Sequence, residues 1–149
     1  MAEIGAKGQG SGNAALAGGC LCGTVKFEIA GEPTLFQYCF CSRCRHVTGS
    51  AHAANLFYAA AGLRWTRGEG RVKQYSHPGT KRFGHAFCTE CGSALPWLLN
   101  AGKHVAVPAG SLEEAPEQRP IQGIYAASRA AWYLDPAALP QHDELPPKN

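Results

Sequence analysis

Three cysteines stand within six positions in the stretch Tyr38-Cys39-Phe40-Cys41-Ser42-Arg43-Cys44-Arg45-His46. On an extended backbone, residues i and i+2 point to the same side, so Cys39 and Cys41 face one point while Phe40 faces away. The turn through Ser42 and Arg43 then brings Cys44 back toward that point. Three converging thiols suit a zinc ion whose fourth position stays open, which is the arrangement of a catalytic rather than a structural site.

The other four cysteines form two close pairs. Cys88-Thr89-Glu90-Cys91-Gly92 has the spacing of a zinc knuckle, in which two thiolates clasp one metal and the following glycine permits a left-handed backbone. A knuckle supplies only two ligands and needs two more from elsewhere. The pair Cys20-Leu21-Cys22 is one source, and part of the 39/41/44 group is the other.

Two divisions of the seven cysteines follow. If Cys20 and Cys22 join Cys88 and Cys91, every cysteine is used, in one closed four-thiolate site and one three-thiolate site with a single open position. In the competing division, Cys41 and Cys44 join the knuckle, and Cys20, Cys22 and Cys39 are left free. The first division keeps the convergence of Cys39 with its neighbours, and its four-thiolate site would contribute directly to folding.

The chain as a whole excludes several classes of protein. An odd number of cysteines, with some only one residue apart, argues against a disulfide framework and for metal binding in a reducing compartment. The sequence has no apolar run long enough to span a membrane and begins without a secretory signal, so a cytoplasmic location is expected. A formal charge of +3 is too small for the clustered basic face of a nucleic-acid binder.

The apolar pattern predicts a mainly β fold in one domain. Residues 24–29 alternate, with Val25, Phe27 and Ile29 toward the core, and residues 35–41 are expected to return as a second strand. Ser42 is a candidate cap for a short helix that ends at Gly49. Further short strands are predicted within residues 51–58, 63–66, 72–75, 82–87, 94–99 and 104–109. Pro96 marks an edge strand or a bulge in this series.

The two ends of the chain differ from its middle in composition and in their lack of a regular apolar pattern. Residues 1–17 are rich in Gly, Ala and Ser without periodicity and are expected to form a flexible tail. The segment from Glu113 onward is Pro-rich and irregular, and we expect it to wrap the sheets through Tyr125 and Trp132. Trp132 and Trp97 are predicted to lie in the core or in a pocket wall.

A three-thiolate zinc has a predictable chemistry. Its net negative charge makes the metal a weak Lewis acid, better suited to binding and deprotonating a thiol than to generating hydroxide. The site therefore favours a sulfur substrate that attacks a small electrophile. Arg43, Arg45 and His46 lie beside the cysteines, either as a solvated turn or as groups that offset the charge of the site or hold an anionic substrate. None of His52, His77, His85 and His104 has ligand spacing, and His85, three residues before Cys88, comes nearest to it.

Several motifs resemble, in order, the glutathione-dependent formaldehyde-activating (GFA, centromere protein V-like) family. They are Gly18-Gly19-Cys20-Leu21-Cys22-Gly23, the Cys-x-Cys-x-x-Cys-Arg run ending in Thr48-Gly49-Ser50, Phe87-Cys88-Thr89-Glu90-Cys91-Gly92, Ala109-Gly110-Ser111-Leu112 and Ser128-Arg129-Ala130-Ala131-Trp132. The resemblance covers residues 18–141, with 142–149 as a C-terminal tail. It implies an Mss4-like fold of small antiparallel sheets.

The same resemblance implies two zinc ions. Cys20, Cys22, Cys88 and Cys91 would hold a structural zinc, and Cys39, Cys41 and Cys44 a catalytic, more labile one. The implied activity joins glutathione or a similar thiol to formaldehyde or a small aldehyde, as in S-hydroxymethylglutathione, which is a carbon–sulfur lyase reaction in reverse. Many relatives carry His at the positions of Phe40 and Gly123.

Two other functions fit the sequence. In the first, both zinc sites are structural and the domain is a non-catalytic interaction module, as some Mss4-like proteins are. In the second, the chain is a redox enzyme similar to methionine sulfoxide reductases, which would need a lone reactive cysteine. Since every cysteine here stands in a close group, the enzyme with an open zinc site is the leading hypothesis.

Overall fold

A computed structural model describes residues 14–148 of the chain, which fold into three small sheets and one short α-helix. The helix is α1 (Ser42–Thr48). The strands are β1 (Leu16–Gly19), β2 (Lys26–Ile29), β3 (Leu35–Cys39), β4 (Ala53–Ala59), β5 (Leu63–Arg67), β6 (Val72–Ser76), β7 (Gly84–Cys88), β8 (Ala94–Leu95), β9 (Trp97–Leu99), β10 (His104–Pro108) and β11 (Gln122–Ile124). Short 3-10 turns cover Ala60–Gly62, Glu69–Arg71, Asn100–Gly102, Ala109–Ser111, Ala126–Ser128 and Pro136–Ala138. The expected mainly β fold is confirmed.

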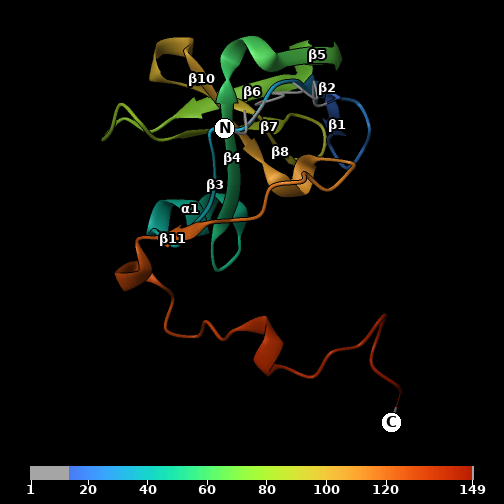
Figure 1. Ribbon diagram of the computed structural model, residues 1–149, viewed down its shortest axis with the longest axis vertical. Helices are drawn as coiled ribbons and strands as arrows, with labels where there is room; N and C mark the ends of the chain where they lie inside the picture. The colour runs from blue at the N-terminus through green and yellow to red at the C-terminus, as the bar shows by residue number, and fades with distance from the viewer. Residues whose placement is uncertain (1–13, 149) are drawn as a thin grey trace, which may run out of the picture.

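The sheets are ordered β1-β2-β5, β11-β3-β4-β10-β9 and β6-β7-β8. All their pairings are antiparallel except one, in which β11 runs parallel to β3. Figure 1 shows α1 and β11 at the same end of the five-stranded sheet, while β4 runs lengthwise through the body. Strand β11 thus forms the edge of this sheet beside β3, the strand that ends at Cys39.

The core forms where the three sheets pack together. Val25, Phe27 and Ile29 are at most 1% exposed, as their alternation predicts, and they meet Leu56 and Leu95 in one buried cluster. Burial of each such side chain contributes roughly 1.5–3 kcal/mol. The sheets therefore hold the cysteine-bearing loops on a packed support.

The predicted strand at 94–99 is divided at Pro96 into β8 and β9, which belong to different sheets. Each is the edge strand of its sheet. Proline has no N–H to donate to a strand ladder, so the chain leaves one sheet at Pro96 and joins the next. The expectation of an edge or bulge at this residue is confirmed.

The ends of the chain differ from the prediction in two ways. Of the expected tail 1–17, residues 1–13 lie outside the described residues, and Leu16 and Ala17 already belong to β1, paired with Ile29 and Glu28. The segment after β11 contacts Phe40 through Arg129 and Tyr133, and the chain beyond them extends away from the sheets (Figure 1). Tyr125 is 64% and Trp132 69% exposed, so the prediction that they anchor this segment, and that Trp132 is core or pocket wall, was wrong.

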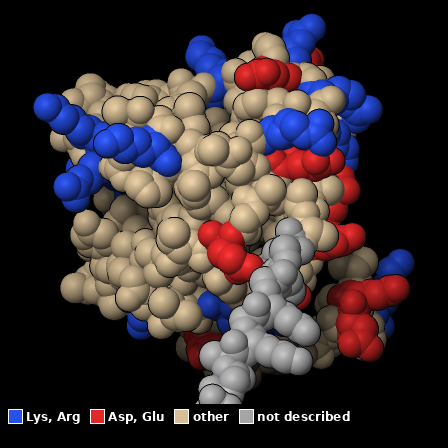
Figure 2. Space-filling view, turned by 45° about the horizontal axis from the view of Figure 1, so that its top comes forward, with Lys and Arg blue, Asp and Glu red and all other residues tan. Residues whose placement is uncertain are grey.

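Charged side chains are unevenly distributed on the surface. On the face shown in Figure 2, Lys and Arg gather at the left edge and at the upper right, where Asp and Glu lie next to them. A further acidic group lies near the middle of this face, and most of the area around it is uncharged. The described residues of this face do not form one continuous basic surface. No helix within residues 14–148 has the length and apolar character required to cross a membrane.

Candidate metal centres

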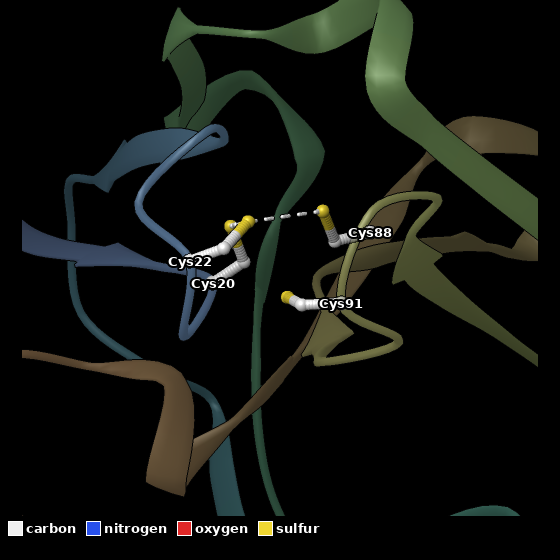
Figure 3. Close-up of side chains that lie close together, drawn as sticks. All are labelled: Cys20, Cys22, Cys88 and Cys91. Carbon is white, nitrogen blue, oxygen red and sulfur yellow. Dashed lines mark hydrogen bonds between the residues drawn. The ribbon is translucent and has the colours of Figure 1, made fainter.

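Four cysteines from two distant loops converge on one point. Cys20 and Cys22 stand in the turn between β1 and β2, Cys88 ends β7, and Cys91 lies in the turn that leads to β8. Their sulfur atoms all lie within 4.8 Å of one another. Figure 3 shows the four side chains pointing toward each other across the two loops. We refer to this group as the four-cysteine cluster.

The spacing of these sulfurs fits a tetrahedral ion. The Cys20 and Cys22 sulfurs are 3.5 Å apart, and those of Cys22 and Cys88 are 3.9 Å apart. A zinc–sulfur bond of about 2.3 Å places tetrahedral ligands roughly 3.8 Å apart. The donor set therefore suits zinc without rearrangement.

The turn that follows Cys91 has the left-handed backbone that a glycine permits. Gly92 has a φ of +73°, in the left-handed region, as the knuckle pattern predicts. Its N–H donates to the carbonyl oxygen of Cys88, which closes the turn. The N–H of Val25 donates to the Cys20 sulfur at 3.2 Å, and the N–H of Leu21 donates to the Ser93 hydroxyl at 2.9 Å. The two loops are thus tied to each other as well as facing each other.

The four thiols differ in how readily they lose a proton. The hydrogen bond with the Ser93 hydroxyl, at 3.2 Å, lowers the pKa of Cys91 from 9.0 to about 6. Burial raises the pKa of Cys88 to about 11. Burial also opposes ionisation of Cys20, but hydrogen bonds from the Val25 N–H and the neighbouring thiols leave its pKa below the usual value. Four thiolates in so small a space require a cation among them.

Cys39, Cys41 and Cys44 form the second group, the three-cysteine cluster, with all three sulfur atoms within 4.8 Å. Cys39 is the last residue of β3, Cys41 precedes α1, and Cys44 lies in its first turn. No His, Asp, Glu or further Cys among residues 14–148 belongs to this cluster. One tetrahedral position is therefore free of protein ligands in the described part of the chain.

The helix start differs from the prediction. Cys41, rather than Ser42, is the N-cap of α1, because its sulfur accepts a hydrogen bond from the Cys44 N–H at 3.4 Å. Strand β3 therefore ends at Cys39 and not at Cys41. Gly49 ends the helix with a φ of +59°, as predicted. The cap turns Cys41 and Cys44 toward the same point, so local helix geometry gathers these two sulfurs.

The three-cysteine cluster is largely enclosed. Cys39 and Cys44 are each 7% exposed and pack with Ala53, Phe83 and Ile124, while Cys41 is partly open. Burial raises the pKa of Cys39 and, more strongly, of Cys44. Burial also works against ionisation of Cys41, but the N–H of Cys44 and the adjacent thiols lower its pKa overall. As in the first cluster, complete ionisation needs a bound cation.

Cationic and aromatic groups border the three-cysteine cluster. The Arg43 guanidinium lies 6.0 Å from the centre of the Phe83 ring, and Nε of Arg45 is buried without a hydrogen-bond partner among the described residues. His46 instead turns its Nδ1 toward the carbonyl oxygen of Ser42, 2.7 Å away on the helix surface. Arg43 thus places its positive charge against Phe83, one of the side chains packed on the cysteines.

Phe40 points away from the cluster, as its alternation with Cys39 and Cys41 predicts. It is 5% exposed and packs on Tyr133, with ring centres 5.5 Å apart, and on His52 at 5.1 Å. The Arg129 guanidinium lies 4.7 Å from the centre of the same ring. Aromatic and cation–π contacts therefore attach the C-terminal segment directly behind the cysteines.

The structure adds residues to the site that the sequence did not identify. Ile124 of β11 accepts a hydrogen bond from the Phe40 N–H at 3.0 Å, and Phe83 comes from the approach to β7. The only sequence signal for the first was the short Gly-Ile-Tyr stretch, and Phe83 had none. None of His52, His77, His85 and His104 belongs to either cluster of the described chain. The division that combined Cys41 and Cys44 with the knuckle is wrong, because their sulfurs lie with that of Cys39.

The seven cysteines fall into the same two groups that the family resemblance implied. The family model for the glutathione-dependent formaldehyde-activating enzyme matches residues 15–128. The chain belongs to this family. A comparison with curated proteins found no match.

A solved structure supports the fold of this family member. It is a Rhodobacter sphaeroides protein determined as a structural genomics target, 22% identical, with a TM-score of 0.57 over 72% of this chain and 99% of that one. At that identity the likeness extends to the fold alone. It agrees with a mainly β domain.

Proposed function

We propose that this chain is a zinc-dependent enzyme of the carbon–sulfur lyase type. It would form or cleave the adduct of a thiol, glutathione or a similar one, with formaldehyde or another small aldehyde. One observation carries the proposal: the three-cysteine cluster has no fourth ligand among the described residues, whereas the four-cysteine cluster is complete. Family membership and the family's name support the same chemistry.

The two clusters would have different roles. Cys20, Cys22, Cys88 and Cys91 join loops from opposite parts of the domain, and a zinc there contributes to folding. Cys39, Cys41 and Cys44 would hold the second zinc, which supplies an open position where a thiol binds as its thiolate. A site with an open position belongs to catalysis rather than to structure.

Residues around the three-cysteine cluster support this function. Ala53, Phe83 and Ile124 pack against the cysteines and exclude water from their buried side, so a sulfur anion bound there is less solvated and more reactive. Arg43 and Arg45 place positive charge beside a centre that three thiolates make negative. They are also suited to the carboxylates of a peptide thiol such as glutathione.

Metal content together with thiol-dependent consumption of formaldehyde tests the proposal. The native chain should contain about two zinc ions and consume formaldehyde only when reduced glutathione is present. Cys44→Ser should lose this activity and one zinc while keeping the fold. Two tightly held zinc ions without any thiol-dependent consumption would favour the non-catalytic interaction module instead.

Cobalt substitution tests thiol binding separately from turnover. Each thiolate that joins a tetrahedral cobalt site strengthens the sulfur-to-metal charge-transfer absorption, so reduced glutathione should increase it. Oxidised glutathione has no thiol and serves as the matched control. A spectrum indifferent to reduced glutathione would contradict this choice of thiol.

A further inference from the structure

A cavity of about 170 Å³ adjoins the three-cysteine cluster on the side of Cys44. It lies between α1, β4, β7 and β9, and Phe83, His85 and Trp97 supply its aromatic walls. Cys44 and Ala53 belong both to the cavity lining and to the packed group around the cysteines. A molecule in this cavity is therefore presented to the same centre where the proposed reaction takes place.

The cavity is free of charge. No Lys, Arg, Asp or Glu lines it, and burial lowers the pKa of His85, so its imidazole is neutral near pH 7. A charged ligand would lose its hydration here without gaining a counter-charge. The carboxylates of a peptide thiol are consequently excluded, and the neutral reactant is the one that fits.

Polar groups of three lining side chains give the cavity a polar part. Asn55 lines it and is only 7% exposed, and Nδ1 of His85 and Nε1 of Trp97, which also line it, are buried without a hydrogen-bond partner among the described residues. Asn55 is two residues from Ala53 on β4, so both side chains face the side of the sheet where the cysteines lie. Buried polar groups in native proteins are normally paired. Two unpaired ring nitrogens and the Asn55 amide in an otherwise apolar lining therefore indicate a ligand with one polar end.

The volume of the cavity limits the size of the apolar part of the ligand. A cavity of about 150 Å³ lined by apolar side chains is known to accommodate benzene. Formaldehyde has no substituent on its carbonyl carbon and would leave this space unused. A single aromatic ring, or a branched chain of similar volume, would fill it.

We infer that the cavity binds the hydrocarbon substituent of an aldehyde whose oxygen accepts a hydrogen bond from the Asn55 amide. This inference rests on the proposed function and narrows its substrate to neutral aldehydes carrying one ring or an equivalent branched group. In the reaction, the thiol sulfur forms a bond to the carbonyl carbon as the C=O π pair moves to the oxygen. The proton lost by the thiol ends on that oxygen, which gives a hemithioacetal with all atoms and charges balanced.

Binding is tested with benzamide, which has the ring and the carbonyl oxygen but does not react with thiols. In a nuclear magnetic resonance titration of the zinc-loaded full chain, the Asn55 side-chain amide and the Trp97 indole signals should shift. The Trp132 indole is an internal control, since that side chain is 69% exposed and lies outside the cavity lining. The absence of shifts at Asn55 and Trp97 would overturn the inference.

Three variants test whether the ligand binds within the cavity. Ala94→Leu fills the space from an exposed lining position on β8 and should weaken benzamide binding by at least about tenfold. Ala59→Leu makes the same change at an exposed position outside the lining and should bind like the native chain. Asn55→Leu should weaken benzamide roughly three- to tenfold while leaving toluene binding unchanged, because only the hydrogen bond is lost. Equal effects of Ala94→Leu and Ala59→Leu would contradict the assignment.

Turnover distinguishes this inference from the proposed function. With glutathione present, Ala94→Leu should lose consumption of benzaldehyde but retain that of formaldehyde. Consumption of formaldehyde by the native chain without benzamide binding would overturn the inference alone. Benzamide binding without consumption of either aldehyde would overturn the proposed function, and with it the role of the cavity in choosing a substrate.

Discussion

The ring of Phe40 occupies the space that a side chain on Gly123 would need. A Cβ built on Gly123 would lie 2.9 Å from Cε2 of Phe40, closer than such atoms approach in folded proteins. The parallel pairing of β11 with β3 places Gly123 opposite Tyr38, next to this ring. The two positions at which the chain differs from many relatives are therefore in direct contact, and the large residue at one accounts for the missing side chain at the other.

This contact predicts a coupled pair of mutations. Gly123→Ala should lower the free energy of unfolding by about 1–3 kcal/mol, because the new methyl group overlaps a buried ring. In a Phe40→Ala background, the same change should cost much less. Thermal unfolding of the four proteins in this double-mutant cycle measures the coupling, and purely additive losses would contradict it.

The two clusters should respond differently to loss of a ligand. Cys88→Ala removes one of four thiolates that join the β1–β2 loop to the β7–β8 loop, and should destabilise the domain by several kcal/mol. Cys44→Ser alters a cluster carried by one local turn and should leave the melting curve nearly unchanged, with about one zinc ion per chain. Global unfolding of Cys44→Ser would show that the three-cysteine cluster is also a structural site.

The low pKa of Cys91 predicts a pH dependence of the metal-free chain. This pKa falls from 9.0 to about 6, with the Ser93 hydroxyl as the largest cause and the backbone N–H groups of Cys22 and Ser93 as further ones. Between these values the folded state therefore binds fewer protons than the unfolded state. The contribution of Cys91 to stability is therefore complete above pH 9 and is lost as the pH falls through about 6. Denaturant unfolding of the chelated protein between pH 6 and pH 9 checks this. Ser93→Ala should flatten the curve, and a slope unaffected by this change would assign it to another group.

Tyr133 and Trp132 are neighbours with opposite expected effects. Tyr133 packs on Phe40 and also lies 5.2 Å from the Arg129 guanidinium, measured to its ring centre. Tyr133→Ala should thus destabilise the domain by about 1 kcal/mol or more. Trp132→Ala should change stability by less than about 0.5 kcal/mol, because that side chain is mostly in solvent. Equal effects in thermal unfolding would mean that the C-terminal segment packs differently.

The parts of the site that could be predicted from sequence are those set by local geometry or by ligand counting. Cys39, Cys41 and Cys44 are near neighbours, so the short reach between them restricts where their sulfurs can go. The need of the knuckle for two more thiolates left two divisions open, and the convergence of Cys39 with its neighbours favoured the one that pairs the knuckle with Cys20 and Cys22. Neither argument required knowledge of the sheet topology.

The remaining features depend on contacts between distant segments. Nothing in the spacing of Gly123 and Ile124 indicates a parallel partner more than eighty residues earlier, because a three-residue strand has too little pattern to specify one. Cys41 took the capping position that Ser42 was expected to occupy, since a sulfur can accept the same N–H. Trp132 was expected to be buried because large aromatics usually are, yet Tyr133 is the residue that meets Phe40.

The separation of the two clusters along the chain also has a consequence for protein synthesis. Cys22 and Cys88 are 66 residues apart, so at about 5–20 residues per second the ribosome needs roughly 3 to 13 seconds to add the second pair of thiols. The cysteines at 39, 41 and 44 are all made within that interval. During that interval the growing chain contains all three cysteines of the three-cysteine cluster but only Cys20 and Cys22 of the four-cysteine cluster. A zinc ion that binds during synthesis thus meets the three-cysteine cluster before the four-cysteine cluster is complete.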